Sequence, residues 1–137
     1  MTIRQLIPVY FLTLAVFFLI DMVWLGVVAK SFYRRHLGYL MGPRVVWPAA
    51  VLFYLLFIAG LLVFAVRPAL VAAAPLKALF LGAFLGLLAY ATYDLTNLAT
   101  IKDWPVIVTA VDLVWGVVLG GLVSWLSALA ARRLLKL

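Results

Sequence analysis

The sequence contains no cysteine, a single histidine, and no glutamate among its four acidic residues. Without cysteine there is no disulfide, thiol nucleophile or thiolate metal ligand. A zinc site needs several nitrogen, sulfur or oxygen ligands, usually including more than one histidine, so His36 alone makes zinc improbable and we expect no metal site. No serine forms a nucleophile motif with His36, and glycine-rich phosphate loops are absent. Any catalysis would therefore depend on aspartate.

Charge is also scarce, at 11% of 137 residues, against about 25% in a typical soluble domain. Four apolar runs occupy nearly the whole chain, at residues 6–29, 45–66, 76–98 and 105–131. Each is roughly 20 to 27 residues, long enough to cross a hydrocarbon core of about 30 Å. The sequence thus predicts one transmembrane domain over residues 1–137. We expect an all-α, integral membrane four-helix bundle with short loops and both termini on the same side.

The net charge of +7 does not indicate nucleic acid as a partner, because the basic residues lie in loops and tails, where they meet lipid head groups. The side of the termini carries six basic residues and the loop side five: Arg4, Arg67, Lys77, Arg132, Arg133 and Lys136 against Lys30, Arg34, Arg35, Arg44 and Lys102. The compact basic tail favours cytoplasmic termini. Whether the chain forms a homo-oligomer stays open at this stage.

Polar residues interrupt the apolar pattern mainly in "YATYDLTNLATIKDWP" at 90–105, and three aspartates fall inside the predicted spans. At 1.5 Å per residue, Asp21, Asp112 and Asp94 lie roughly 12, 10 and 6 Å from the loop-side ends of their spans. A charge at that depth costs at least about 2.5 to 3.5 kcal/mol, so such residues face the bundle interior and have partners. The sequence therefore predicts a polar site in the loop-side half of the membrane.

The third span carries a stripe that turns from small to polar residues: Gly82, Gly86, Tyr90, Tyr93 and Asn97, flanked by Asp94. Spacings of three and four place these residues on one helix face. The glycines predict close packing against another helix. The polar end of the same stripe predicts a pocket.

Spans one and four share a pattern, "DMVWLG" at 21–26 and "DLVWG" at 112–116. In each, aspartate and tryptophan lie three residues apart and share a face. The match resembles a fragment of an inverted repeat, but coincidence is the favoured explanation in a chain rich in valine, leucine and tryptophan. We expect Asp21 and Asp112 to face one another as a pair in which one carboxyl retains its proton, since both cannot ionise cheaply in a poorly hydrated site.

The first loop, "KSFYRRHLGYLMGP", predicts either a short amphipathic helix or a solvated connector. Its cations have two interpretations. Lys30 and Arg34 would bind an anionic group of a ligand, or the basic residues would neutralise the buried aspartates in salt bridges. An oxygen-ligated Mg²⁺, Ca²⁺ or Na⁺ at the aspartates and Asn97 is a remaining, less favoured option.

Three stretches together resemble a known family: "DMVWLGVVAKSFYRRHLG" at 21–38, "FYLLFIAGLLVF" at 53–64 and "GLLAYATYDLTNLATIKDWPVIVTAVDLVWG" at 86–116. They are similar to the predicted bacterial membrane proteins grouped as domain-of-unknown-function family 2177. The resemblance implies a four-helix protein of the bacterial inner membrane and brings no activity with it. Its recurrent positions are Asp21, Trp24, Lys30, Tyr33, Tyr93, Asp94, Asn97, Trp104, Asp112 and Trp115.

Our leading hypothesis is a site that binds or translocates a small polar or amphipathic ligand, such as a lipid, with Tyr90, Trp24 and Trp115 as apolar walls. Its predicted residues are Asp21, Trp24, Lys30, Tyr33, Arg34, Tyr90, Tyr93, Asp94, Asn97, Asp112 and Trp115. The alternatives are a membrane enzyme or enzyme subunit that acts on lipid or isoprenoid substrates by aspartate acid/base chemistry, and a non-catalytic assembly subunit. The sequence names no cofactor.

Overall fold

A computed structural model describes all residues 1–137, and helices are its only regular secondary structure. Four helices are long and apolar enough to cross a membrane: Ile3–Leu37, Trp47–Val71, Pro75–Thr100 and Val106–Leu134. Their segments in chain order are α1 (Ile3–Trp24), η1 (Leu25–Ala29), α2 (Lys30–Leu37), α3 (Trp47–Leu61), η2 (Leu62–Val66), α4 (Arg67–Val71), α5 (Pro75–Thr100) and α6 (Val106–Leu134). The all-α, four-span prediction is confirmed.

The first helix differs most from its predicted bounds, because it continues past Ala29 to Leu37. No proline interrupts the chain between Trp24 and Leu37, and the helix stops just before Gly38. The loop helix proposed from the sequence is thus a continuation of the first span. The last part of the quoted loop, with Leu40 and Met41, lies beyond the helix end in the connector of residues 38–46.

The wide π-helical turn η1 controls which side chains of the first helix share a face. Tyr33 follows Asp21 by twelve residues, which in an uninterrupted α-helix would rotate it about 120° away. A π turn accommodates one extra residue and reduces that rotation to about 20°. Asp21 and Tyr33 therefore point toward the same side of the helix, where the polar site lies.

A second π turn, η2, precedes a proline inside the second helix. Pro68 has no N–H to donate to residue 64, and its ring would crowd that carbonyl in a regular α-helix. The wider turn at Leu62–Val66 changes the pattern of backbone hydrogen bonds, so that the Arg67 N–H donates to the carbonyl of Leu62. The helix can therefore continue to Val71 without a break.

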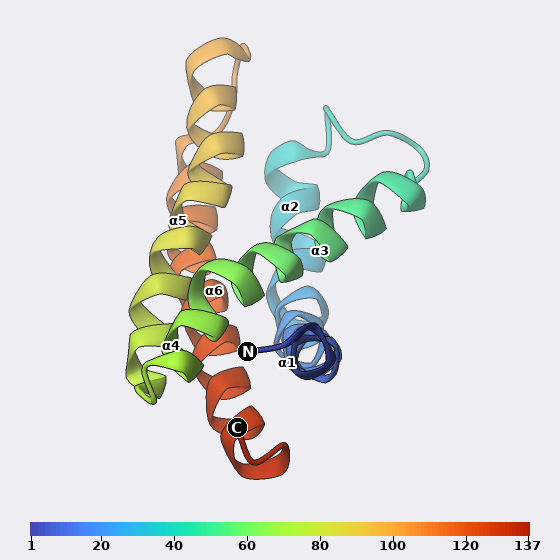
Figure 1. Ribbon diagram of the computed structural model, residues 1–137. Helices are drawn as coiled ribbons and strands as arrows, with labels where there is room; N and C mark the ends of the chain where they lie inside the picture. The colour runs from blue at the N-terminus through green and yellow to red at the C-terminus, as the bar shows by residue number, and fades with distance from the viewer.

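Helices α5 and α6 form the closest contact in the molecule, side by side along most of their length (Figure 1). A Cβ added at Gly86 would lie 1.9 Å from the carbonyl oxygen of Gly116, and one at Gly120 would lie 2.2 Å from that of Gly82. Each helix thus contributes two glycines four residues apart, an arrangement that lets backbones touch. The predicted role of the glycine stripe in close helix packing agrees with this geometry.

The apolar core occupies the half of the bundle that contains the termini. One cluster joins Val9, Val66, Ala69, Ala78 and Ala128, and Met1 and Leu137 both pack against it. Both termini therefore lie at one end, the terminal side, as predicted. A second cluster around Phe17, Ile58, Leu61, Leu119 and Val123 fills the middle of the bundle.

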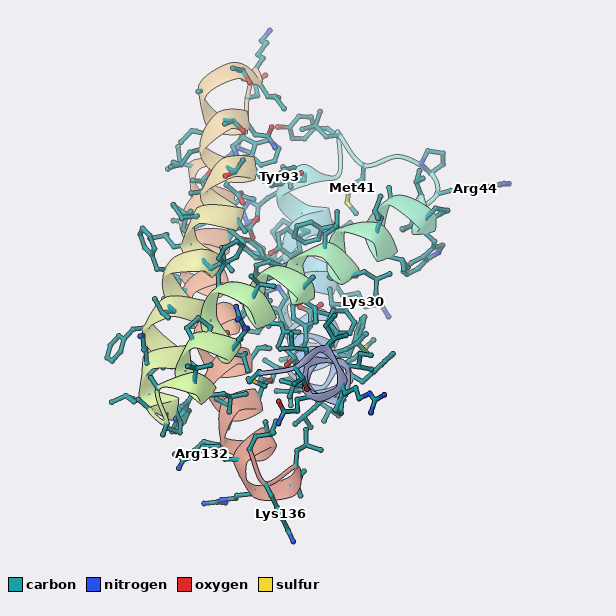
Figure 2. All side chains as sticks on the ribbon, in the orientation of Figure 1. Lys30, Met41, Arg44, Tyr93, Arg132 and Lys136 are labelled. Carbon is teal, nitrogen blue, oxygen red and sulfur yellow. The ribbon has the colours of Figure 1, made fainter.

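At the opposite end, the loop side, the helices separate. Figure 1 shows α3 crossing α5 and α6 obliquely and diverging from them toward its first residue, Trp47. The connector is held at its start by Tyr39, whose hydroxyl donates a hydrogen bond of 2.5 Å to the carbonyl of Asp103 in the α5–α6 turn. Figure 2 shows Arg132 and Lys136 far from Tyr93 and Met41, at the terminal side. The divergence of α3 leaves a space in the loop-side half.

Candidate functional site: a polar cluster and a lateral groove

Three aspartates from three different helices are buried in the loop-side half. Asp94 on α5 is fully buried, and Asp21 on α1 and Asp112 on α6 are 4% and 5% exposed. No lysine or arginine is among the neighbours that influence them, which are tyrosines, a tryptophan and one another. The salt-bridge interpretation of these aspartates is therefore not supported. Asp21 and Asp112 have aromatic neighbours, whereas the neighbour of Asp94 is Asp112.

Asp112 accepts a hydrogen bond from the hydroxyl of Tyr33, which α2 brings to the face of α6. The Trp24 indole is a neighbour of the same hydroxyl. Asp94 is the carboxyl neighbour of Asp112 across the α5–α6 interface. Neither oxygen of Asp94 has a hydrogen-bond partner. Burying a polar group without such a partner in an apolar medium costs free energy.

Asp21 occupies a separate position beside Tyr54 of α3 and Trp115 of α6. Trp115 in turn stacks on Trp24, with ring centroids 4.3 Å apart and an angle of 8° between the planes. The two Asp and Trp patterns of spans one and four therefore pack against each other. This contact fixes α1 on α6 at the level of the polar cluster.

The expected pairing of Asp21 with Asp112 is wrong, because the carboxyl beside Asp112 is that of Asp94. Asp94 lies one turn beyond Tyr90 on the inner face of α5, where the close glycine packing brings it against α6. Asp21 instead lies beside Tyr54 and Trp115, and Tyr90 neighbours all three carboxyls. The acidic residues form no group of three around one point, so a shared hard-cation site has no support.

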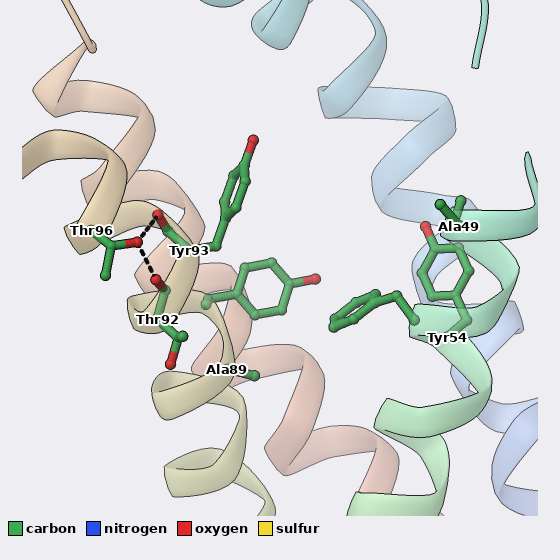
Figure 3. A pocket seen from close by; sticks show the side chains of 9 residues that line it. Ala49, Tyr54, Ala89, Thr92, Tyr93 and Thr96 are labelled. Carbon is green, nitrogen blue, oxygen red and sulfur yellow. Dashed lines mark hydrogen bonds between the residues drawn. The ribbon is translucent and has the colours of Figure 1, made fainter. Parts of the chain in front are cut away.

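A groove with a volume of about 950 Å³ lies between α3 and α5, next to this cluster. Its walls are Ala49, Ala50, Phe53, Tyr54, Ala89, Tyr90, Thr92, Tyr93 and Thr96. Figure 3 shows Tyr54 on α3 across the groove from Ala89 and Tyr93 on α5. Tyr54 and Tyr90 are both neighbours of Asp21, so the groove borders on the buried carboxyl.

The threonines of the polar stretch satisfy their own hydrogen bonds along α5. Thr92 donates to the carbonyl of Leu88 at 2.7 Å, and Thr100 donates to that of Thr96 at 2.8 Å. Thr96 donates to the carbonyls of Thr92 and Tyr93, as the dashed lines in Figure 3 show. Such bonds to the preceding turn make threonine compatible with lipid. Within the helical part of the stretch, the polar side chains left without such a bond are therefore the tyrosines, Asn97 and Asp94.

The remaining predicted site residues fall into three places. Tyr93 borders the groove, stacks edge-on against Trp104 and has Asn97 as its neighbour. Trp24 and Trp115 line a different, apolar depression instead of the groove walls. Lys30 and Arg34 line a third depression on the outer face of η1 and α2, and Figure 2 shows Lys30 pointing away from α5 and α6. The residues that were predicted to line one pocket therefore lie at three separate places.

Sequence reasoning missed Tyr54, a groove residue on α3 that neighbours Asp21. Between Trp47 and Arg67 it is the sole residue with a hydrogen-bonding side chain. An isolated polar side chain in an otherwise apolar span needs a partner, so this signal was present. Its partner on another helix was not readable from spacing.

A sequence model of one family matches residues 6–129, and its description reads "Predicted membrane protein (DUF2177)". The chain belongs to this family. The resemblance found in the sequence is therefore confirmed over nearly the full length. No curated protein and no solved structure matches the chain significantly. Family membership agrees with four apolar helices in identifying a protein embedded in a lipid bilayer.

Proposed function

We propose that the groove between α3 and α5 binds a small amphipathic molecule that enters sideways from the bilayer. Its volume of about 950 Å³ falls within the usual range of ligand sites, about 300 to 1,000 Å³. Most of the lining is apolar, with a few hydroxyl groups. This composition suits a molecule with a hydrocarbon body and a small hydrogen-bonding head.

The observation that carries the proposal is the arrangement of Tyr54 and Tyr90, which come from opposite walls and are both neighbours of Asp21. Two hydroxyls backed by a buried carboxyl form a donor and acceptor set for a hydroxyl or amine head group. No lysine or arginine lines the groove. An uncharged or cationic head is thus favoured over the anionic group suggested by Lys30 and Arg34.

The groove supports binding better than catalysis. None of its lining residues is an aspartate: Asp21 lies behind Tyr54 and Tyr90, and the pair of Asp94 and Asp112 is buried. Acid or base catalysis by aspartate needs the carboxyl within hydrogen-bond reach of the reacting atom. Translocation would use the same groove, and a flux assay in proteoliposomes separates it from binding alone.

Filling the groove should displace the ligand. We expect Ala89→Trp to reduce ligand retention at least about ten-fold, because an indole would occupy the space beside Tyr54 and Tyr90. Native mass spectrometry of gently extracted protein measures the bound mass. Ala15→Trp on the exposed face of α1 is the matched control and should leave retention unchanged. Equal retention in the two variants would refute the groove as the binding site.

Removing one hydroxyl should weaken binding without closing the groove. We expect Tyr54→Phe to lower affinity about five-fold, which corresponds to one hydrogen bond of about 1 kcal/mol. An anionic ligand that binds Tyr54→Phe as well as the unaltered protein would contradict the proposed head-group chemistry.

For location, we propose a multi-pass protein of the bacterial inner membrane with cytoplasmic termini. The support is the family resemblance and the basic tail of Arg132, Arg133 and Lys136. Reporter fusions at Leu137 and within residues 38–46 test the orientation. Cytoplasmic activity at Leu137 alone is the expected result, and activity at the connector alone would reverse the topology.

A further inference from the structure

The outer face of η1 and α2 carries a basic depression that the groove does not include. It has a volume of about 600 Å³ and is lined by Gly26, Val27, Lys30, Ser31, Arg34 and Arg35. All three cations are exposed, and the lining contains no acidic side chain. The π turn and the helix after it thus place three positive charges and one hydroxyl around a common hollow.

Guanidinium and ammonium groups with a hydroxyl form a suitable donor set for a phosphate. Arginine offers paired N–H donors to two phosphate oxygens, and lysine adds a compact positive charge. None of the side-chain hydrogen bonds within the protein involves Lys30, Arg34 or Arg35. The depression therefore presents unused donors to a ligand.

An apolar stripe leads from this depression along α1 toward the membrane centre. Leu19, Val23 and Val27 follow one another at intervals of four, and they are 72%, 65% and 75% exposed. Residues at this spacing share one helix face. A hydrocarbon chain could lie along this stripe while its head group reaches Ser31 and the cations at the loop-side end.

We propose that this face binds an anionic phospholipid of the loop-side leaflet, with the phosphate in the basic depression and an acyl chain along the stripe. The apolar stripe favours a lipid over a free phosphate ion, and the charge favours an anionic head group over a zwitterionic one. This site is independent of the groove between α3 and α5, whose lining has no cation.

The test compares two variants that each lose three exposed positive charges. Lys30→Gln, Arg34→Gln and Arg35→Gln are combined in one variant, and Arg4→Gln, Arg133→Gln and Lys136→Gln in the control. Both proteins are placed in nanodiscs of phosphatidylcholine with a minor fraction of phosphatidylglycerol, and the co-purified lipid is counted by native mass spectrometry. We expect the first variant to retain about ten-fold less phosphatidylglycerol than the control and the unaltered protein.

Three results would overturn the proposal. The first is equal retention of phosphatidylglycerol in the two variants, which would mean that net charge alone attracts the lipid. The second is equal retention of phosphatidylcholine and phosphatidylglycerol by the unaltered protein. The third is full displacement by millimolar inorganic phosphate, which would identify a free anion as the ligand. Unchanged unfolding temperatures of both variants confirm that the comparison concerns binding, because all six side chains are exposed.

Discussion

Replacing Gly86 by valine is expected to lower the free energy of unfolding by about 3 kcal/mol or more, at the upper end of overpacking effects. Even one Cβ at this position would lie 1.9 Å from the backbone carbonyl oxygen of Gly116. A backbone atom cannot rotate aside, so α5 and α6 would have to separate. Separation would disturb the contact of Asp94 with Asp112 and the position of Tyr90 beside the groove.

The matched control is Gly60→Ala on α3, where the nearest atom to an added Cβ is a side-chain carbon of Leu85 at 3.7 Å. This distance is an ordinary van der Waals contact, so stability should change little. Unfolding is followed in mixed detergent micelles by tryptophan fluorescence. Equal unfolding midpoints for Gly86→Val and Gly60→Ala would show that the two helices do not touch at their glycines.

The second large effect is expected at Asp112. Asp112→Ala should cost about 1 to 3 kcal/mol, because the Tyr33 hydroxyl then loses its acceptor in a buried site. Asp112→Asn retains a side-chain oxygen that accepts the same hydrogen bond, so it should fold almost normally. The same unfolding assay measures both variants, and equal losses for alanine and asparagine would contradict this account.

A double variant separates the hydrogen bond from other effects of Asp112→Ala. Adding Tyr33→Phe removes the orphaned hydroxyl and should restore part of the lost stability, with a coupling energy of about 1 kcal/mol. Strictly additive losses would mean that the Tyr33 contact contributes nothing. Asp94→Asn provides a further comparison, since an amide can donate to Asp112 and removes a buried carboxyl that has no hydrogen-bond partner.

The number and type of helices followed from the sequence because lipid imposes a simple rule. Every backbone N–H and C=O must be satisfied within the span, so an apolar run of sufficient length becomes a helix. The same rule explains why the ends were less accurate. Helix α2 lies beyond the apolar run, and its polar residues continue the helix since nothing stops it before Gly38.

The depth of the aspartates was also readable, because distance along a helix axis depends only on residue number. Their partners were not. The direction in which the side chains of the first helix point depends on the π turn η1. No residue type between Leu25 and Ala29 predicts such a turn. The pairing of Asp112 with Asp94 depends on the close approach of α5 and α6, which needs the glycines of both helices.

The groove could not be predicted from the sequence for a different reason. Its volume comes from the oblique course of α3, and the crossing angle of two helices is set by packing that composition does not encode. On the α5 side, Tyr90 and Tyr93 were expected from the predicted stripe, whereas Ala89, Thr92 and Thr96 were not. The opposite wall, with Tyr54, depends on the tertiary arrangement.

The most direct test of the central claim is an electron cryo-microscopy map of the protein extracted with its native lipids. We expect elongated density between α3 and α5 that ends within hydrogen-bond distance of the Tyr54 and Tyr90 hydroxyls. The same density should be absent from the map of Ala89→Trp. A map in which α3 packs directly onto α5 and closes the groove would contradict the account.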